Sequence, residues 1–113
     1  MTTWHDCTGF QRDILQAIAT ITNGDDLPYG LAIKEYLDER YTDPINHSRL
    51  YQNLDQLAEK NLVEQSAVDD RTNAYTLTDA GQQALQTHAV DLAAISGALS
   101  PTESSPVTDG GEL

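Results

Sequence analysis

The sequence is poor in cysteine, in lysine and in long apolar runs. Cys7 is the only cysteine, which excludes an intramolecular disulfide and a zinc site built from several thiolates. No apolar stretch approaches the about 20 residues that a membrane helix requires. The first residues also lack the basic start and apolar stretch of a secretory signal. We therefore expect a cytoplasmic protein that has no membrane partner.

Catalytic and metal-binding patterns are missing as well. His5, His47 and His88 are too far apart for the histidine spacings of metal sites. The chain has no glycine-rich phosphate loop and no serine nucleophile elbow. The sequence thus predicts no catalytic residue, no metal and no cofactor, so the protein is not expected to be an enzyme.

Cys7 leaves one chemical alternative open. It stands beside Asp6 and near His5, but neighbours in sequence do not make a catalytic triad. We expect Cys7 to precede the first helix in a mobile stretch. If the thiol faces the positive end of that helix, its pKa is lowered. Direct sensing of oxidants by this thiol is therefore an alternative to be tested.

Cations are scarce compared with anions. Lys and Arg number 6 and Asp and Glu number 18, which gives a formal charge of -12. This balance argues against a nucleic-acid binder by the usual rule of a basic patch. The acids, however, are spread along the chain from Asp6 to Glu112, as in proteins of extreme halophiles, and only two residues are lysines. Molar salt shortens the Debye length to about 3 Å or less and screens the self-repulsion of such a surface. An ordinary acidic domain is the alternative.

The 113 residues of the chain fit one domain. Helical periodicity dominates the first half of the chain. Apolar residues recurring at spacings of three and four predict helices over residues 8–21, 31–41 and 46–60. Thr8 can cap the first of them. Pro44 favours a break before the third, because the residue preceding proline avoids the helical region.

A hairpin and a long helix are expected to follow. Strands are predicted over residues 62–67 and 73–77, after which Thr78 caps a last helix. Three helices, a hairpin and a helix make a mainly α fold with a small β-hairpin, which is a winged helix-turn-helix followed by a C-terminal dimerisation helix. The predicted organisation is a winged helix-turn-helix DNA-binding domain over 8–78, a dimerisation helix over 79–99 and a disordered tail over 100–113.

Residues 10–99 resemble the PadR-like winged-helix transcriptional regulators, in the ordered stretches YGLAIKEYLDERY, HSRLYQNLDQLAEKNLVE and DDRTNAYTLTDAG. Arg49-Leu50-Tyr51, followed by Leu54 and Leu57, is similar to the recognition helix of that family. Tyr75-x-Leu77-Thr78-x-x-Gly81 is similar to its passage from wing to last helix, which MarR-type regulators share. Together with the acidic composition, the resemblance is to members of haloarchaeal type. It implies transcription regulation and a role in the oxidative-stress response.

The third predicted helix has the side chains that a groove-reading helix needs. Such a helix requires donors and acceptors near its N-terminal end. Arg49 could contact guanine with two hydrogen bonds, and Gln52 or Asn53 could contact adenine in the same way. The alternative is a polar face turned to solvent, which any surface helix has. The candidate DNA-binding residues of this helix are Asn46, His47, Ser48, Arg49, Gln52 and Asn53.

Three further cationic residues are candidates for contacts with the DNA backbone. Arg71 and Thr72 lie at the expected tip of the wing, where an arginine could enter a minor groove or meet a phosphate. Alternatively, Arg71 is a turn residue that offsets nearby acids. Lys34 and Arg12 are further candidates for phosphate contacts.

The last predicted helix carries a narrow apolar seam at alternating spacings of four and three. Seams of this kind pair with another helix. We therefore expect a homodimer that binds a pseudo-palindromic operator in double-stranded DNA. Folding back of the seam on the first helix is the alternative, at least in part. The candidate interface residues are Leu85, His88, Leu92, Ile95 and Leu99.

The patterns together favour a sequence-specific DNA-binding transcriptional regulator that acts as a homodimer in a cytoplasm of high salt. The alternative is a winged-helix module that binds protein within a transcription or replication assembly. An exposed apolar patch on the third helix would favour that alternative, whereas the residues predicted there are polar.

Overall fold

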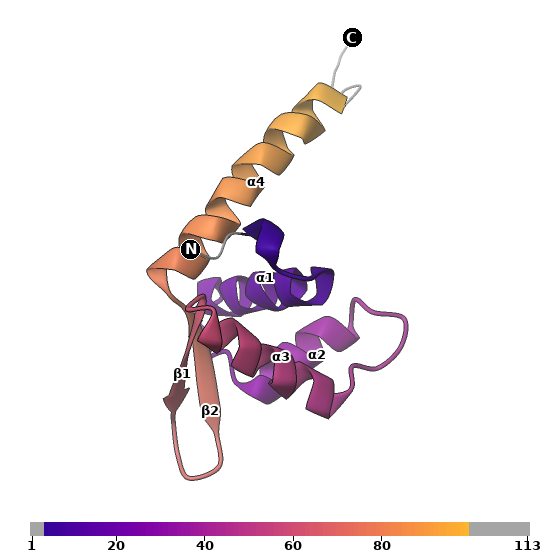
Figure 1. Ribbon diagram of the computed structural model, residues 1–113. Coiled ribbons are helices and arrows are strands. Elements are labelled where there is room, and N and C mark those ends of the chain that lie inside the picture. Colours follow the sequence, from indigo (N-terminus) through magenta and orange to yellow (C-terminus); the bar gives the residue numbers. More distant parts are fainter. Residues whose placement is uncertain (1–3, 100–113) are drawn as a thin grey trace.

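A computed structural model describes residues 4–99 of the protein. Three helices form the body, a two-stranded hairpin projects from one side, and the last helix extends away on the opposite side (Figure 1). The mainly α fold with a small β-hairpin is as predicted, whereas the predicted tail over 100–113 lies outside the described residues. The elements in chain order are the short 3-10 helix η1 (Trp4–Asp6), α1 (Gly9–Asn23), α2 (Gly30–Asp38), α3 (His47–Glu59), β1 (Val63–Ala67), β2 (Asn73–Leu77) and α4 (Asp79–Leu99).

Helix α1 is the centre of the packing, because it contacts α2, α3, α4 and β2. It begins as predicted at Thr8, whose hydroxyl accepts from the backbone N–H of Gln11 while the Gln11 side chain accepts from the Thr8 backbone N–H. This reciprocal capping box satisfies donors that the first turn would otherwise leave unpaired. Phe10, Ile14 and Ile18 of α1 are buried in the core, which fixes the face that α1 turns inward.

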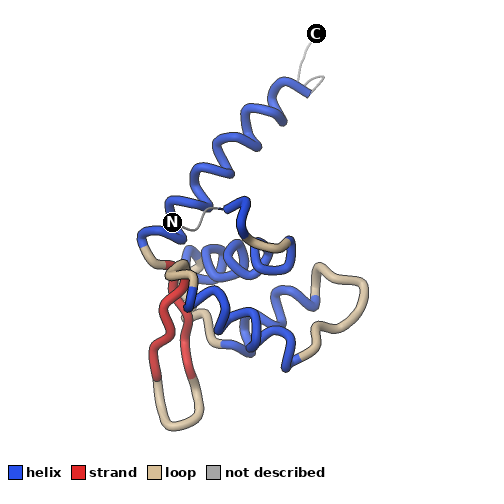
Figure 2. Tube along the Cα trace, in the orientation of Figure 1, coloured by secondary structure: helices blue, strands red, loops and turns tan. Residues whose placement is uncertain are grey.

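Helix α2 ends at Asp38, so the expected continuation to Tyr41 is wrong. A carboxylate oxygen of Asp38 accepts from the backbone N–H of Ile45 at 2.7 Å and thereby turns the chain into the loop of residues 39–46. The Tyr41 hydroxyl donates to Asp13 of α1 and holds the loop from its other side. Figure 2 shows this loop curving outward between α2 and α3.

The junction between the hairpin and α4 explains the Leu-Thr-x-x-Gly sequence there. Asn61, two residues after the last residue of α3, lies in the left-handed region with φ 62°, as predicted. The Thr78 hydroxyl accepts from the backbone N–H of Gly81 at 3.0 Å and so caps α4. A Cβ on Gly81 would overlap the carbonyl of Leu62, whose oxygen also accepts from the Thr78 N–H at 3.1 Å. Strand β1 begins at Val63, one residue later than predicted. Only glycine lets α4 leave the hairpin this closely.

Cys7 is buried, with 5% of its surface exposed, so the expectation that it lies in a mobile stretch is wrong. The stretch is ordered because Trp4, in η1, is also buried and packs under α4. Burial raises the pKa of the Cys7 thiol, which is opposite to the lowering that the positive end of α1 would produce. None of the helices in residues 4–99 is long and apolar enough to cross a membrane.

Candidate nucleic-acid interface

Helix α3 turns a polar face outward. Leu50, Leu54 and Leu57 are completely buried, whereas Ser48 and Gln52, on the other side of the helix, are exposed. None of the exposed large hydrophobic side chains in the described part of the chain belongs to α3. The outer face of α3 therefore offers hydrogen-bonding groups and no apolar patch.

The first residues of α3 are held by contacts of two kinds. The Asn46 side chain caps the helix by accepting from the backbone N–H of Arg49 at 2.9 Å. The His47 ring lies against the Tyr51 ring, with centroids 4.5 Å apart. Tyr51 in turn rests on Gly30 of α2, where a Cβ would overlap its hydroxyl. These contacts place Asn46 at the tip of α3 and His47 on its flank toward α2.

Arg49 lies on the opposite flank of α3, toward α1. Its guanidinium carbon is 3.9 Å from the centroid of the Phe10 ring, within the range of a cation–π contact. Stacking uses the flat face of a guanidinium and leaves its N–H groups free to point sideways. The contact therefore orients Arg49, which remains exposed, at the edge of the outer face of α3.

Asn53 is engaged inside the protein, unlike Gln52. Its side-chain N–H donates to the carbonyl of Arg49 at 2.8 Å, and its oxygen accepts from Gln11 at 3.2 Å. Of the two amides predicted as contacts to adenine, Gln52 is thus the one that faces outward. Asn53 instead joins α3 to α1.

The hairpin forms the wing, with Arg71 and Thr72 at its tip. Val68 donates its N–H to the Thr72 carbonyl at 2.8 Å, and the Asp69 carboxylate accepts from the Arg71 N–H, which lowers the pKa of Asp69. Within residues 4–99, the Arg71 guanidinium is exposed and makes no ion pair. A cavity of about 430 Å³ separates the wing from the start of α2 and is lined by Tyr29, Gly30, Leu31, Ala32, Glu35, Tyr51, Arg71, Thr72 and Asn73.

Two other predicted phosphate contacts have partners within the chain. The Lys34 ammonium lies 2.9 Å from the Asp38 carboxylate, and this contact lowers the pKa of Asp38. The Arg12 guanidinium donates to the carbonyls of Trp4 and His5, so that it faces η1. Neither cation extends the outer face of α3, and Arg71 and Arg49 are the cations best placed beside it.

The predicted seam on α4 divides into two parts. Leu85 packs against the core, as the alternative of folding back on the first helix had suggested, whereas His88 stacks on Trp4 of η1. Beyond them Leu92 and Ile95 are 54% and 55% exposed, although both are apolar. Leu99 belongs to α4, and its side chain lies outside the described residues.

Residues 16–87 match the Transcriptional regulator PadR-like family. The chain belongs to this family. It is therefore a transcriptional regulator and not an enzyme, in agreement with the sequence prediction. The match covers the second half of α1, then α2, α3, the wing and the first part of α4.

Solved structures of RosR from H. salinarum are similar to this chain. The complex structure of hsRosR-S1 has 44% sequence identity, covers 83% of this chain and 77% of that chain, and gives a TM-score of 0.67. The structure of H. salinarum RosR grown from NaBr has 40% sequence identity, covers 89% of this chain and 82% of that chain, and also gives a TM-score of 0.67. A mutant MarR from E. coli complexed with operator DNA has 22% identity over 74% of this chain and 54% of that chain, with a TM-score of 0.60, and shares the fold. A search of curated proteins found no match.

Two residues with a part in this architecture were missed by the sequence analysis. Trp4 was passed over because nothing in the sequence indicates that α4 covers it. Gln11 carried a signal, since Thr8-x-x-Gln11 is a capping-box pattern. That pattern predicts the cap of α1 but not the hydrogen bonds of Gln11 to α3.

Proposed function

We propose that this PadR-like regulator binds double-stranded DNA with sequence specificity, through α3 in the major groove and the wing on the adjacent backbone or minor groove. The observation that carries the proposal is the outer face of α3, on which Ser48 and Gln52 present uncharged hydrogen-bonding groups and Arg49 stands at the edge. Side chains of this kind at the N-terminal half of a groove-reading helix are those that discriminate base pairs.

The predicted DNA-binding residues divide by role in this proposal. Ser48, Arg49 and Gln52 read base edges, and Arg71 with Thr72 contacts the DNA from the wing. The remaining candidates support the reading helix. Asn46 caps it, and His47 stacks on Tyr51. Asn53 joins the helix to α1, and Lys34 forms the ion pair that orders the loop before α3.

The second part of the proposal is that the regulator acts as a homodimer through α4. Leu92 and Ile95 lie on one side of a helix that extends away from the body, and they have no apolar cover within the described chain (Figure 1). Leu99 would continue this seam at the same helical spacing. Leu85 and His88 belong to its packed base. A two-fold dimer implies a pseudo-palindromic operator with half-sites about 34 Å, one helical turn or a multiple, apart.

The setting of the regulator is inferred from composition and similarity. A charge of -12 spread along the chain favours a cytoplasm of high salt. The identity of 40–44% with RosR of H. salinarum supports a related role, which we take to be in the oxidative-stress response. The alternative of a protein-binding module has no support from α3, whose exposed side chains include no large hydrophobic residue.

A gel shift with genomic fragments in molar KCl tests the proposed function. Retardation of a small set of fragments, competed by unlabelled copies of the same fragments and not by bulk DNA, is the expected result. Retardation of all fragments alike, or of none, would contradict sequence-specific DNA binding.

A further inference from the structure

Gln11 is an unusual member of the core. It lies in the first turn of α1 with 2% of its surface exposed, and it is the only buried amide or charged side chain in the described part of the chain. A polar side chain is tolerated in a core when its hydrogen bonds are satisfied, and leaving one unsatisfied is unfavourable. The partners of Gln11 therefore restrict how the elements around it can pack.

All four hydrogen-bonding positions of the Gln11 amide are used. Its nitrogen donates to the side-chain oxygen of Asn53 at 3.2 Å and to that of Gln56 at 2.9 Å. Its oxygen accepts from the backbone N–H of Thr8 at 3.2 Å and from the Lys60 ammonium at 2.9 Å. An amide offers two donors and two acceptor sites, so Gln11 is saturated.

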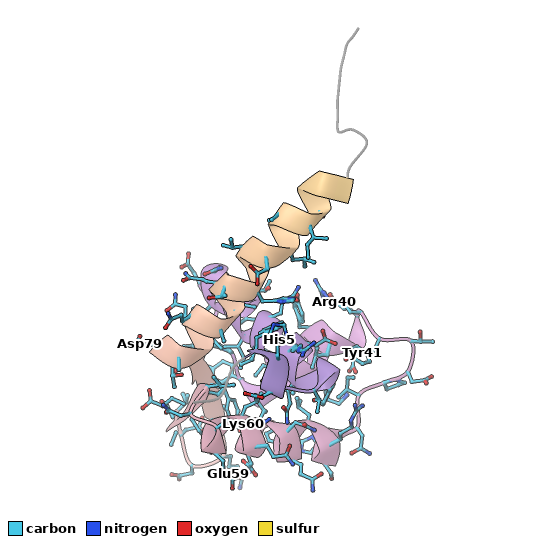
Figure 3. The ribbon with its side chains drawn as sticks, turned by 45° about the horizontal axis from the view of Figure 1, so that its top comes forward. His5, Arg40, Tyr41, Glu59, Lys60 and Asp79 are labelled. Carbon is cyan, nitrogen blue, oxygen red and sulfur yellow. The ribbon has the colours of Figure 1, made fainter. Side chains whose placement is uncertain are left out.

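Three of the four partners belong to α3 or to the residue that follows it. Asn53, Gln56 and Lys60 line the side of α3 that faces α1, and Lys60 reaches on to the carbonyl of Asp6 at 3.3 Å. In Figure 3, Lys60 lies on the body side of α3, whereas its neighbour Glu59 lies on the outer side. Gln11 thus holds α3 along about two turns of its length.

These hydrogen bonds fix the rotation and the position of α3, which burial of its leucines alone would leave free. Burial of Leu50, Leu54 and Leu57 is non-directional, so a small rotation or shift of α3 would retain most of its apolar contacts. Hydrogen bonds weaken steeply when their angles change. Any rotation of α3 that moves Asn53 or Gln56 away from Gln11 also turns Gln52, which lies beside Asn53 in sequence, relative to bound DNA.

We propose that Gln11 is a positioning residue that determines the DNA specificity of this regulator without contacting DNA. It does so by setting the rotation of α3 and hence the bases that Ser48, Arg49 and Gln52 meet. This inference rests on the proposed function, because it assigns to α1 a part in the reading of DNA by α3.

The variant Gln11→Glu tests the inference selectively. Its carboxylate can still accept from the Thr8 N–H and pairs with the Lys60 ammonium, but it has no N–H group to donate to Asn53 and Gln56. The probes are a duplex selected from random DNA by the wild-type protein and a shuffled duplex of the same composition. Fluorescence anisotropy gives both dissociation constants, and their ratio measures specificity.

The control is Ile18→Val, which removes a methylene from a completely buried side chain of α1 that has no hydrogen bond to α3. It lowers the melting temperature and should leave the specificity ratio unchanged. We expect Gln11→Glu to lower that ratio about tenfold, a loss comparable to one mismatched base pair, with little change in binding to the shuffled duplex. A specificity ratio equal to that of the wild type in folded Gln11→Glu would overturn the inference.

Gln56→Ala provides a second test from the side of α3. Gln56 is exposed, so its truncation is compatible with folding even if Gln11→Glu is not. A fall in the specificity ratio that is smaller than the one expected for Gln11→Glu supports the inference, and a ratio equal to that of the wild type contradicts it. If the wild-type protein itself does not distinguish the selected duplex from the shuffled one, the proposed function fails before any variant is measured.

Discussion

The ring of His88 stacks on the ring of Trp4, with centroids 4.6 Å apart and planes inclined by 21°. This contact joins the middle of α4 to the N-terminal turn η1, and His5 lies beside it, its ring centroid 6.2 Å from that of His88 (Figure 3). The base of α4 is therefore fixed to the body. Residues 89–97 of α4 are exposed in the single chain, and among them Leu92 and Ile95 are available for a second copy.

The homodimer should depend on Leu92 and Ile95 together. Because both are about half exposed in the single chain, the double variant Leu92→Asp and Ile95→Asp should fold and sediment as a monomer, since burying two carboxylates in an apolar seam is unfavourable. Val90→Asp is the matched control, because Val90 is 69% exposed on the opposite side of the helix. A dimer of unchanged affinity in the double variant, measured by sedimentation equilibrium, would refute the seam.

Cys7 should be dispensable for DNA binding and for the oxidant response. Burial raises the pKa of its thiol, which keeps the thiol protonated near neutral pH and slow to react. Cys7→Ser should bind the operator with the affinity of the wild type and still respond to oxidants in the cell. Loss of the response with DNA binding intact would instead identify Cys7 as the sensor.

Acid should weaken the loop that leads into α3. Hydrogen bonds from Lys34 and from the Ile45 N–H hold the pKa of Asp38 below its ordinary value in the folded state. A lowered folded-state pKa contributes stability above the unfolded pKa, and this contribution is lost as the pH falls through the folded value. Asp38→Asn should therefore have a lower melting temperature than the wild type at neutral pH. Its melting temperature should also fall less than that of the wild type when the solution is acidified. Asp43→Asn, in the same loop, is the control, and identical pH profiles for Asp38→Asn and wild type would contradict the prediction.

The affinity of this protein for its operator should depend on salt differently from that of a basic repressor. A dimer would carry 2 × -12 = -24 formal charges, and several of its cations are engaged within the chain, including Lys34 and Arg12. Cations held by acids near the DNA would offset the release of counterions, so affinity should fall weakly, stay flat or rise between about 0.5 and 3 M KCl. A steep fall, with a slope near -0.9 per phosphate contact, would mean that a local cationic patch dominates.

Local signals in the sequence were sufficient for most of the elements. Thr8 and Thr78 mark helix starts, and Asn61 marks a helix end, because caps and left-handed residues act within a few positions. The end of α2 could not be predicted in the same way. It is set by the hydrogen bond that the Ile45 N–H donates to the Asp38 carboxylate, which joins residues seven apart across a loop.

The candidate interface was predictable in its residue types and less so in their orientation. The sequence places Arg49 and Asn53 among the polar residues in the N-terminal half of α3. It does not reveal that Phe10 lies under Arg49 or that Gln11 binds Asn53, because α1 and α3 are about 40 residues apart in the chain. Cys7 was misplaced for the same reason, since its cover depends on tertiary packing.

The central claim is that the outer face of α3 reads DNA sequence, and Arg49→Ala tests it most directly. The measurement is the affinity of wild type and variant for a selected operator and for a random duplex in molar KCl, with Arg40→Ala as the control. Arg40 is exposed and stacks on Tyr36, away from the outer face of α3. We expect Arg49→Ala to lose about 1–3 kcal/mol of binding free energy on the operator and little on random DNA. An equal loss on both duplexes would reduce Arg49 to a phosphate contact, and unchanged binding to both would contradict the assignment of α3 as the reading helix.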